Sequence, residues 1–363
     1  MSDKGRILWV DLVRAAGMIL IFWGHSLYSQ TGNAGILIYE VNVPVFFILS
    51  GYLFHEQPVF KQMVKLFYNL IVPYVVTCFI MVLLSLIKNH FPNIILLKSM
   101  GPVKADLMTS FWGIGTRGRL AFSNYVANPI GAIWFLLALF WCSILFNVLI
   151  KLLKKLNYFY ISMTVISLCI MLASFWMANA FAIFPWSLNA ALIGVIFMWG
   201  GYILRKLDII HKSNTQKLIV LLLALMMWGL ALIFKVHFWF NFAITNNVPI
   251  AIISAFGGSI VLILIAVWVE ELFSKLQLIK WIALFGKYSL VALCIDSIDG
   301  NVLFINQHII SRIPNVESIV VLEELIYLIS LPVISMVILR KIPFLRSCYF
   351  NREFGFPWQW GRN

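Results

Sequence analysis

Residues 6–55 decide the architecture of this chain. They begin with RILWVDLVRAAGMILIFWGHSLYS (residues 6–29) and end with NVPVFFILSGYLFH (residues 42–55). The first stretch is apolar and long enough to cross a bilayer as a helix, which takes about 20 residues. It nevertheless contains Asp11, Arg14 and His25. Because a charged side chain at membrane depth is costly, such residues usually mark a functional site.

Arg14 and His25 are expected to lie on one face of the first helix. A helix turns by about 100° and rises by about 1.5 Å per residue, so between Arg14 and His25 it comes back to within roughly 20° of its starting direction and rises about 16 Å. Asp11 precedes Arg14 by one turn, a spacing that favours an ion pair. The pattern therefore predicts one groove with Arg14 deep inside it and His25 farther along.

The composition predicts an all-α, polytopic membrane helical bundle. Of the 363 residues, 62% are hydrophobic and 11% are charged, whereas soluble domains are about half apolar and a quarter charged. We expect about ten transmembrane helices, at roughly residues 7–29, 36–55, 66–87, 131–150, 158–177, 188–204, 217–235, 248–269, 282–304 and 320–339. The integral membrane domain is predicted over residues 1–341, with an external loop at about 88–130, and a basic, aromatic tail over 342–363 at the cytoplasmic membrane surface.

The net charge of +13 is explained by membrane topology and not by nucleic-acid binding. With the N-terminus placed in the cytoplasm, 19 of the 27 Lys and Arg residues fall on the cytoplasmic side and seven outside. This bias predicts a multi-pass protein with both termini in the cytoplasm. The five cysteines are scattered, so their spacing indicates neither a disulfide framework nor a metal site.

These stretches resemble acyltransferase family 3, whose members are membrane-bound O-acyltransferases. The family pattern of an Arg, ten residues and a His in the first span matches Arg14 and His25. The second span matches through Phe46, Phe47, Ser50, Gly51 and Tyr52, and Trp134 is a later landmark. Asn42 and Asp296 stand where the branch that acetylates sugars such as fucose typically has His.

The resemblance implies an O-acetyltransferase that moves acetyl from cytoplasmic acetyl-CoA to a hydroxyl of a cell-surface glycan (O-antigen, capsule or exopolysaccharide) or of its lipid-linked precursor. Acetyl-CoA is then a donor substrate and no bound cofactor is expected. The expected partners are the acyl-CoA donor, the glycan acceptor and membrane lipids, in the inner (cytoplasmic) membrane. A homodimer is left open.

Acyl transfer to a hydroxyl needs a base and stabilisation of the developing oxyanion. His25 is the candidate base, since imidazole titrates near neutral pH. Arg14, oriented by Asp11, is the candidate donor anchor. Glu40 or Asp296 is expected to orient His25 as a further catalytic group, and Glu40 is the better candidate because its predicted depth is near that of His25. No nucleophilic Ser or Cys has a base at a recognisable spacing, which favours direct transfer.

The external loop contains the candidate acceptor-binding residues Trp112, Arg117, Arg119 and Asn124. Aromatic faces beside amides and guanidinium groups suit glycan recognition. A loop that merely packs over the helices would contain the same residue types.

Three alternatives stay open. The chain could be a transporter or flippase of glycan or lipid intermediates, with the intramembrane charges lining the path. It could be an O-succinyltransferase of the same family. In a purely structural interpretation, Asp11 and Arg14 form a helix-packing ion pair and His25 closes the interface.

Overall fold

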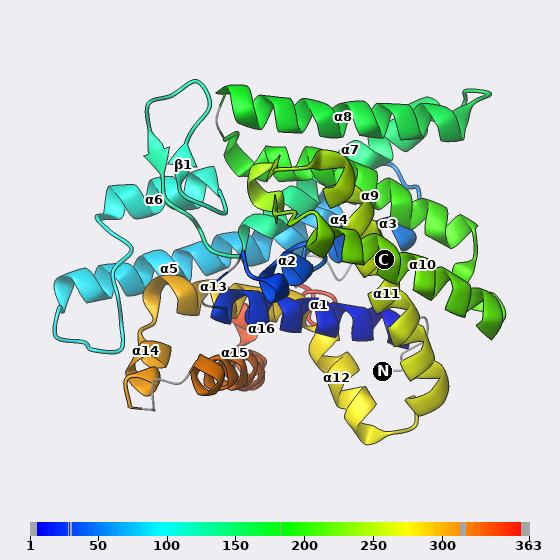
Figure 1. The fold of residues 1–363 in the computed structure, drawn as a ribbon. Helices are drawn as coiled ribbons and strands as arrows, with labels where there is room; N and C mark the ends of the chain where they lie inside the picture. The colour runs from blue at the N-terminus through cyan, green and yellow to red at the C-terminus, as the bar shows by residue number, and fades with distance from the viewer. Residues whose placement is uncertain (1–5, 28, 30, 182, 313–316, 357–363) are drawn as a thin grey trace.

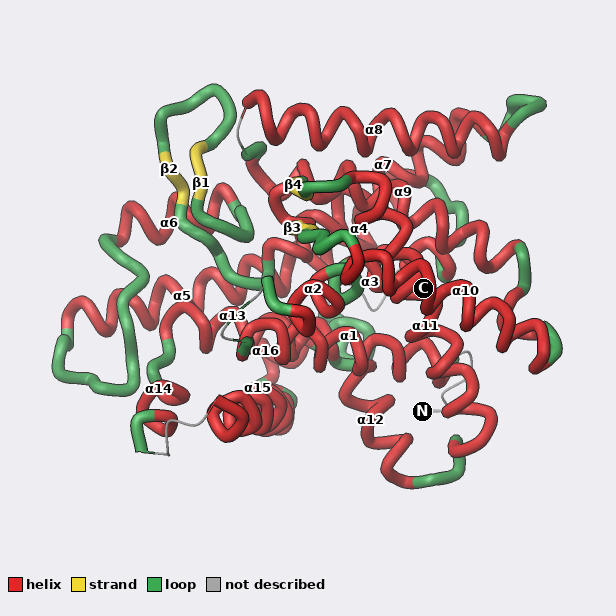
Figure 2. The backbone as a smooth tube through the Cα atoms, in the orientation of Figure 1, coloured by secondary structure: helices red, strands yellow, loops and turns green. Residues whose placement is uncertain are grey.

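The structure, a computed structural model, describes residues 6–27, 29, 31–181, 183–312 and 317–356. Helices make up most of this part of the chain, and the strands are short (Figure 2). Within it, nine helical segments are long and apolar enough to cross a membrane, or ten if one bent helix pair is a single span. This confirms the predicted polytopic all-α bundle of about ten spans.

The N-terminal motif occupies three helices. α1 is Leu8–Ser26, α2 is Asn33–Tyr39 and α3 is Pro44–Tyr52. The predicted second span is therefore interrupted by a turn at residues 40–43, and α3 begins at Pro44, which has no N–H to continue the preceding helix. Glu40 and Asn42 lie in this turn, and their backbone N–H groups donate to the Ile36 and Ile38 carbonyls at 3.3 and 2.9 Å.

Ten further helical segments follow in the first two thirds of the chain. They are α4 (Val59–Leu66), a π-helical turn (Phe67–Ile71), α5 (Val72–His90), α6 (Val103–Trp112), α7 (Trp134–Leu153), α8 (Phe159–Phe181), a short 3₁₀ turn (Pro185–Ser187), α9 (Leu188–Lys206), a second 3₁₀ turn (Ile209–His211) and α10 (Asn214–Ile233). The π-helical turn joins α4 to α5 just before Pro73, so the third span runs from Val59 to His90 and is longer than predicted. Figure 1 shows α8 along one edge of the bundle, beside α7 and α9.

Two glycines allow α3 and α9 to cross closely. A Cβ on Gly51 would lie 1.8 Å from the carbonyl oxygen of Met198, and a Cβ on Gly201 would lie 1.9 Å from that of Ile48. Small residues at such crossings let helix backbones approach in membrane bundles. The Phe47 ring of α3 then stacks on Phe240 with centroids 5.1 Å apart, which fixes α3 against the segment that follows α10.

The predicted span 282–304 falls on two helices that are bent relative to each other and that pass as one span together. α11 (Val248–Phe273) leads to α12 (Gln277–Lys287), and α13 (Ser289–Val302) turns away from α12 by 65°. Gly286, just before the bend, faces the α1 backbone so closely that a Cβ would lie 1.8 Å from the Asp11 carbonyl oxygen. The absent side chain lets α12 touch α1, and the bend then carries α13 along it.

Small extramembrane elements gather at one end of the bundle. Antiparallel pairs join β1 (Gly118–Arg119) to β2 (Val126–Ala127), and β3 (Phe238–Trp239) to β4 (Ile244–Thr245), with a 3₁₀ turn (Phe240–Phe242) between β3 and β4. α6, the β1–β2 hairpin and α14 (Ile305–Ile310) lie on the left in Figure 1. The loop before α6 is tied to the end of α13 because Lys98 N donates to the Val302 carbonyl and Phe304 N to that of Leu96.

The tail is part of the bundle in the described residues. α15 (Glu317–Leu339) is followed by α16 (Pro343–Tyr349). Tyr349 and Phe350 are buried, and the Tyr349 hydroxyl lies 2.9 Å from Thr77 Oγ1 of α5. The bundle itself therefore covers these two rings of the predicted tail, whereas Phe344 is exposed. Residues 357–363, which include Trp358 and Trp360, lie outside the described residues.

Candidate active site

A large cavity lies at the end of the bundle that carries the two hairpins. Its volume is ≈ 840 Å³, in the range typical of small-molecule sites. Its wall comes from the end of α1, the α2–α3 turn, the loops around 98, 115–116 and 129–132, the start of α7, residues 238–242, α13 and α15. Segments far apart in the sequence therefore meet around one space.

His25 and Asp296 form the ionisable pair of this cavity. His25 Nδ1 lies 3.4 Å from Asp296 Oδ2, with the Asp296 side chain only 7% exposed and that of His25 43% exposed. Both residues line the cavity. A carboxylate on one ring nitrogen leaves the other, Nε2, available as a proton acceptor. The pair is thus arranged as an oriented base.

Asn42 adds an unsatisfied polar atom to the same wall. The residue is 4% exposed, it lines the cavity, and its Oδ1 has no hydrogen-bond partner among the described residues. A buried amide oxygen without a partner costs about 1–3 kcal/mol. A ligand hydroxyl in the cavity would supply the missing donor.

Glu40 lies two residues before Asn42 but has a different environment. It is fully buried, and its Oε2 accepts a hydrogen bond of 2.7 Å from Ser254 of α11. It is not among the residues that line the cavity. The structure therefore brings Asp296 and not Glu40 to His25.

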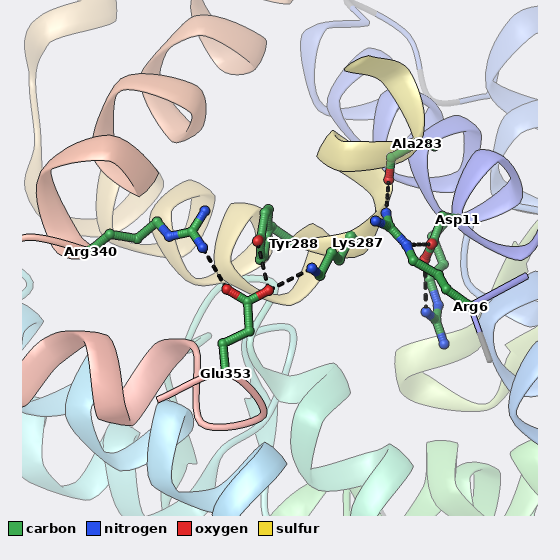
Figure 3. Close-up of polar contacts among 8 residues, drawn as sticks. Arg6, Asp11, Ala283, Lys287, Tyr288, Arg340 and Glu353 are labelled. Atoms are coloured by element: carbon green, nitrogen blue, oxygen red, sulfur yellow. Dashed lines mark hydrogen bonds and ion pairs between the residues drawn. The ribbon is translucent and has the colours of Figure 1, made fainter. Parts of the chain in front are cut away.

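Arg14 lies away from the cavity, in a charged cluster near the start of α1. Arg14 Nη1 is 3.2 Å from Asp11 Oδ1, as the spacing predicted, and Arg6 Nε is 2.5 Å from Asp11 Oδ2. Arg6 Nη2 also donates to the Ala283 carbonyl of α12 at 3.1 Å. Figure 3 shows Arg6 reaching from Asp11 to Ala283. One buried carboxylate thus serves two guanidinium groups.

The cavity wall carries further ionisable groups, beginning with Asp299, one turn after Asp296 on α13. The Tyr327 hydroxyl donates to Asp299 Oδ1 at 2.6 Å, and Lys98 and Glu324 also line the cavity. Burial lowers the pKa of Lys98, in the loop before α6, while the Asp299 carboxylate opposes that shift. The lysine is thus part of the same cavity wall as the acids.

The comparison with protein families decides the class of this site. The family model described as "Acyltransferase domain" matches residues 7–339, nearly the whole chain. The chain belongs to acyltransferase family 3. It is therefore a membrane acyltransferase. Neither the curated proteins nor the solved structures contain a match.

The motif residues of the acyltransferase divide between the cavity and the packing around it. Phe46 and Trp134 line the cavity. Behind them, Ser50 Oγ donates to the Phe46 carbonyl at 2.8 Å, and Tyr52 packs edge-on against Trp9 with centroids 5.1 Å apart. Together with the core residue Phe47 and the close crossing at Gly51, these contacts hold the α2–α3 turn in place.

The residues predicted to bind the acceptor lie beside the cavity and do not line it. Trp112 packs with the small cluster of Ile114, Leu120, Ala127 and Ile183. Arg119 donates to the Ser123 carbonyl and to Asn124 Oδ1, at 3.0 and 2.8 Å, within the β1–β2 turn. Arg117 and Asn124 are exposed. The segment predicted as the external loop instead contributes Lys98, Gly115, Thr116 and Pro129 to the wall.

Sequence reasoning missed the loop between α10 and α11. Trp239, Asn241 and Phe242 line the acyltransferase cavity, and Asn241 Nδ2 donates to Thr116 Oγ1 of the other external loop. The local signal is the run HFWFNF (residues 237–242), in which five aromatic rings accompany one amide side chain outside any predicted span. Its short length made it resemble an ordinary connection.

Proposed function

We propose that this acyltransferase transfers an acetyl group from acetyl-CoA to a hydroxyl of a cell-surface glycan or its lipid-linked precursor. The observation that carries the proposal is the His25–Asp296 pair in the wall of the ≈ 840 Å³ cavity. In an acyltransferase, an oriented imidazole beside a space for the acceptor supplies the proton acceptor that an attacking hydroxyl requires.

In the proposed reaction, the acceptor hydroxyl attacks the thioester carbonyl carbon while its proton passes to Nε2 of His25. A C–O bond forms, the C–S bond breaks, and the proton then passes from His25 to the departing CoA thiolate. Asp296 stabilises the imidazolium and favours the tautomer with hydrogen on Nδ1. Asn42 Oδ1, unpaired and buried, accepts a hydrogen bond from the glycan and positions it.

The lining of the cavity suits a glycan acceptor. Trp134, Trp239 and Phe242 offer aromatic faces, and Asn241 and Asn301 are amide-bearing residues of the wall. Flat apolar rings beside hydrogen-bonding groups match the alternating apolar and hydroxyl faces of a sugar. The aromatic and amide lining of the cavity supports a glycan as the acceptor and does not bear on the identity of the acyl group. An O-succinyltransferase would use the same base and cavity.

The donor is proposed to reach the site from the side of Arg14. The roughly 16 Å rise between Arg14 and His25 along α1 matches the reach of a pantetheine arm. Arg14 then anchors the donor and His25 acts at the acceptor. With the charge bias of the loops, this supports a topology in which both termini and the donor are in the cytoplasm and the hairpins lie outside the inner membrane.

Transfer of labelled acetyl from acetyl-CoA, by protein purified in detergent, into the lipid-linked glycan fraction of the host membranes tests the function. We expect transfer by the native protein and a large loss in Trp239→Ala, with Arg119→Ala as the control because Arg119 is outside the cavity. A transporter would move the lipid-linked glycan across vesicles without consuming acetyl-CoA. That outcome would remove the proposal.

The orientation has a separate test. Cysteines introduced at Ser123 and at Ser213 would be labelled from opposite sides of the membrane, in a background where the exposed Cys169 is replaced by Ser. We expect an impermeant maleimide to label position 123, but not 213, in intact cells. Labelling of position 213 from outside would reverse the topology.

A further inference from the structure

The wall of the acyltransferase cavity has spare hydrogen-bond acceptors, while several of its donors are already used. Three donor side chains of the wall bind backbone carbonyl groups of the protein: Tyr39 at 3.0 Å, Ser297 at 3.1 Å and Asn301 at 2.8 and 3.1 Å. By contrast, Asn42 Oδ1 and Asn306 Oδ1 are buried acceptors without a hydrogen-bond partner among the described residues, and both residues line the cavity. A ligand that satisfies this wall must therefore bring hydrogen-bond donors.

Two carboxylates add to this excess of acceptors. Asp299 follows Asp296 by one turn of α13, Glu324 belongs to the neighbouring α15, and all three line the cavity. Tyr327, one turn after Glu324 on α15, donates its hydroxyl to Asp299 Oδ1 at 2.6 Å. This hydrogen bond joins the faces of α13 and α15 that carry the two carboxylates.

The acids of the wall outnumber its cationic groups. Among the described residues, Lys98 is the only lysine or arginine that lines the cavity. Even with His25 protonated against Asp296, the carboxylates of Asp299 and Glu324 exceed the one ammonium group of Lys98. A sugar carboxylate or phosphate in this space would meet like charge, whereas sugar hydroxyls would find acceptors.

We propose that Asp299 and Glu324, together with the unpaired oxygens of Asn42 and Asn306, make the cavity selective for a neutral sugar residue and exclude sugars that carry a carboxylate or phosphate. Selectivity of this kind uses repulsion of the wrong substrate as well as contacts to the right one. The inference rests on the proposed function, because it names which glycan residues enter the acceptor side of that cavity. Asp299 and Glu324 are specificity-determining residues, and the proton acceptor remains His25.

Oligosaccharides released from the envelope glycans of the host, separated by anion exchange into a neutral and an acidic pool, test the proposal. The purified full chain transfers labelled acetyl from acetyl-CoA to each pool, and tandem mass spectrometry locates the label. We expect uncharged residues to be labelled about tenfold or more in excess of charged residues, in the acidic pool as well as in the neutral one, because like charges brought together in the cavity repel.

Variants of the two acids should weaken this selectivity. In Glu324→Gln and in Asp299→Asn we expect the labelled share of charged residues to rise severalfold, and the amide of Asn at position 299 still offers an oxygen to the Tyr327 hydroxyl. Glu323→Gln is the matched control, because Glu323 has the same charge one residue away and does not line the cavity. We expect the control to keep the native labelling ratio.

Equal labelling of charged and uncharged residues by the native protein would overturn the proposal. A native preference for charged residues that Lys98→Gln abolishes would also overturn it, because Lys98 would then be an anion-binding residue. An unchanged ratio in both variants, with folding confirmed by size exclusion, would remove the two acids from the selectivity.

Calorimetric binding of the two pools separates this inference from the proposed function. Preferred binding of the neutral pool by a native protein that transfers no acetyl would support the selectivity and remove the proposed function. Transfer of acetyl without discrimination between the residues would support the proposed function and remove the selectivity. Binding of neither pool, without transfer, would remove both.

Discussion

Replacing Asp296 by Asn tests whether the carboxylate acts through His25. Two unit charges 3.4 Å apart interact by about 5 kcal/mol at an effective dielectric constant of about 20. Because the His25 side chain is 43% exposed, solvent screens the pair, and we take about 2 kcal/mol as the stabilisation of the imidazolium. Since about 1.4 kcal/mol is tenfold in rate, Asp296→Asn should slow transfer roughly 30-fold.

The assay is single-turnover acetyl transfer into the lipid-linked glycan fraction, beside calorimetric binding of acetyl-CoA. His25→Ala removes the base and should cost about 10²–10⁴-fold in rate with donor affinity retained. The double variant should be no slower than His25→Ala, because Asp296 has no base left to orient. His55→Ala is the control, since that imidazole is exposed and bonded locally to the Leu53 carbonyl.

Two results would refute this reasoning. A folded His25→Ala protein with near-normal transfer would return His25 to a packing role. Losses that multiply in the double variant would show that Asp296 contacts the substrate independently of His25.

Three further outcomes follow from burial. Glu40→Gln should keep both activity and detergent stability, because the amide preserves the Ser254 contact, whereas Glu40→Ala should lower stability. In Gly286→Ala, α12 must move by about 1.2 Å to bring the new Cβ from 1.8 to 3.0 Å from the Asp11 carbonyl oxygen, and we expect weaker donor binding. Gly229→Ala is the control, because a Cβ there meets nothing within 4 Å. Burial raises the pKa of Asp106 above its ordinary value, so the contribution of Asp106 to the free energy of unfolding falls as pH rises above about 3.9. Asp106→Asn should therefore flatten the dependence of the melting temperature on pH. Equal slopes for the native protein and the variant would refute this reasoning.

The helical class was predictable because hydrophobic length and charge bias are local properties. The pairing of Asp11 with Arg14 was predictable for the same reason, since it needs only helix geometry. The interruption at residues 40–43 and the bend between α12 and α13 were not, because each depends on contacts with distant helices. The contact between Gly286 and Asp11 joins residues far apart in the sequence.

The cavity was the least predictable feature. His25 and Asp296 could be suspected separately, but predicted depth in the membrane favoured Glu40 over Asp296 as the partner of His25. Both are acids in apolar stretches, and only packing shows that Ser254 takes one while His25 meets the other. The loops between the spans posed the same difficulty, because the sequence alone makes Trp112 and Trp239 equally plausible sugar-binding residues. Only the structure shows that Trp239 lines the cavity and that Trp112 does not.

The bent pair of helices explains how both ends of the Arg14–His25 motif are held at once. α12 contacts α1 at Asp11 through Gly286, and α13 then meets α1 again where Asp296 reaches His25. One segment therefore supports the charged cluster at one end of α1 and the base at the other. Glu353 binds Lys287 and Tyr288 at the bend, so the C-terminal segment is attached to the same pair of helices. α12 and α13 thus form one continuous physical connection between the Asp11–Arg14 pair and the carboxylate that contacts His25.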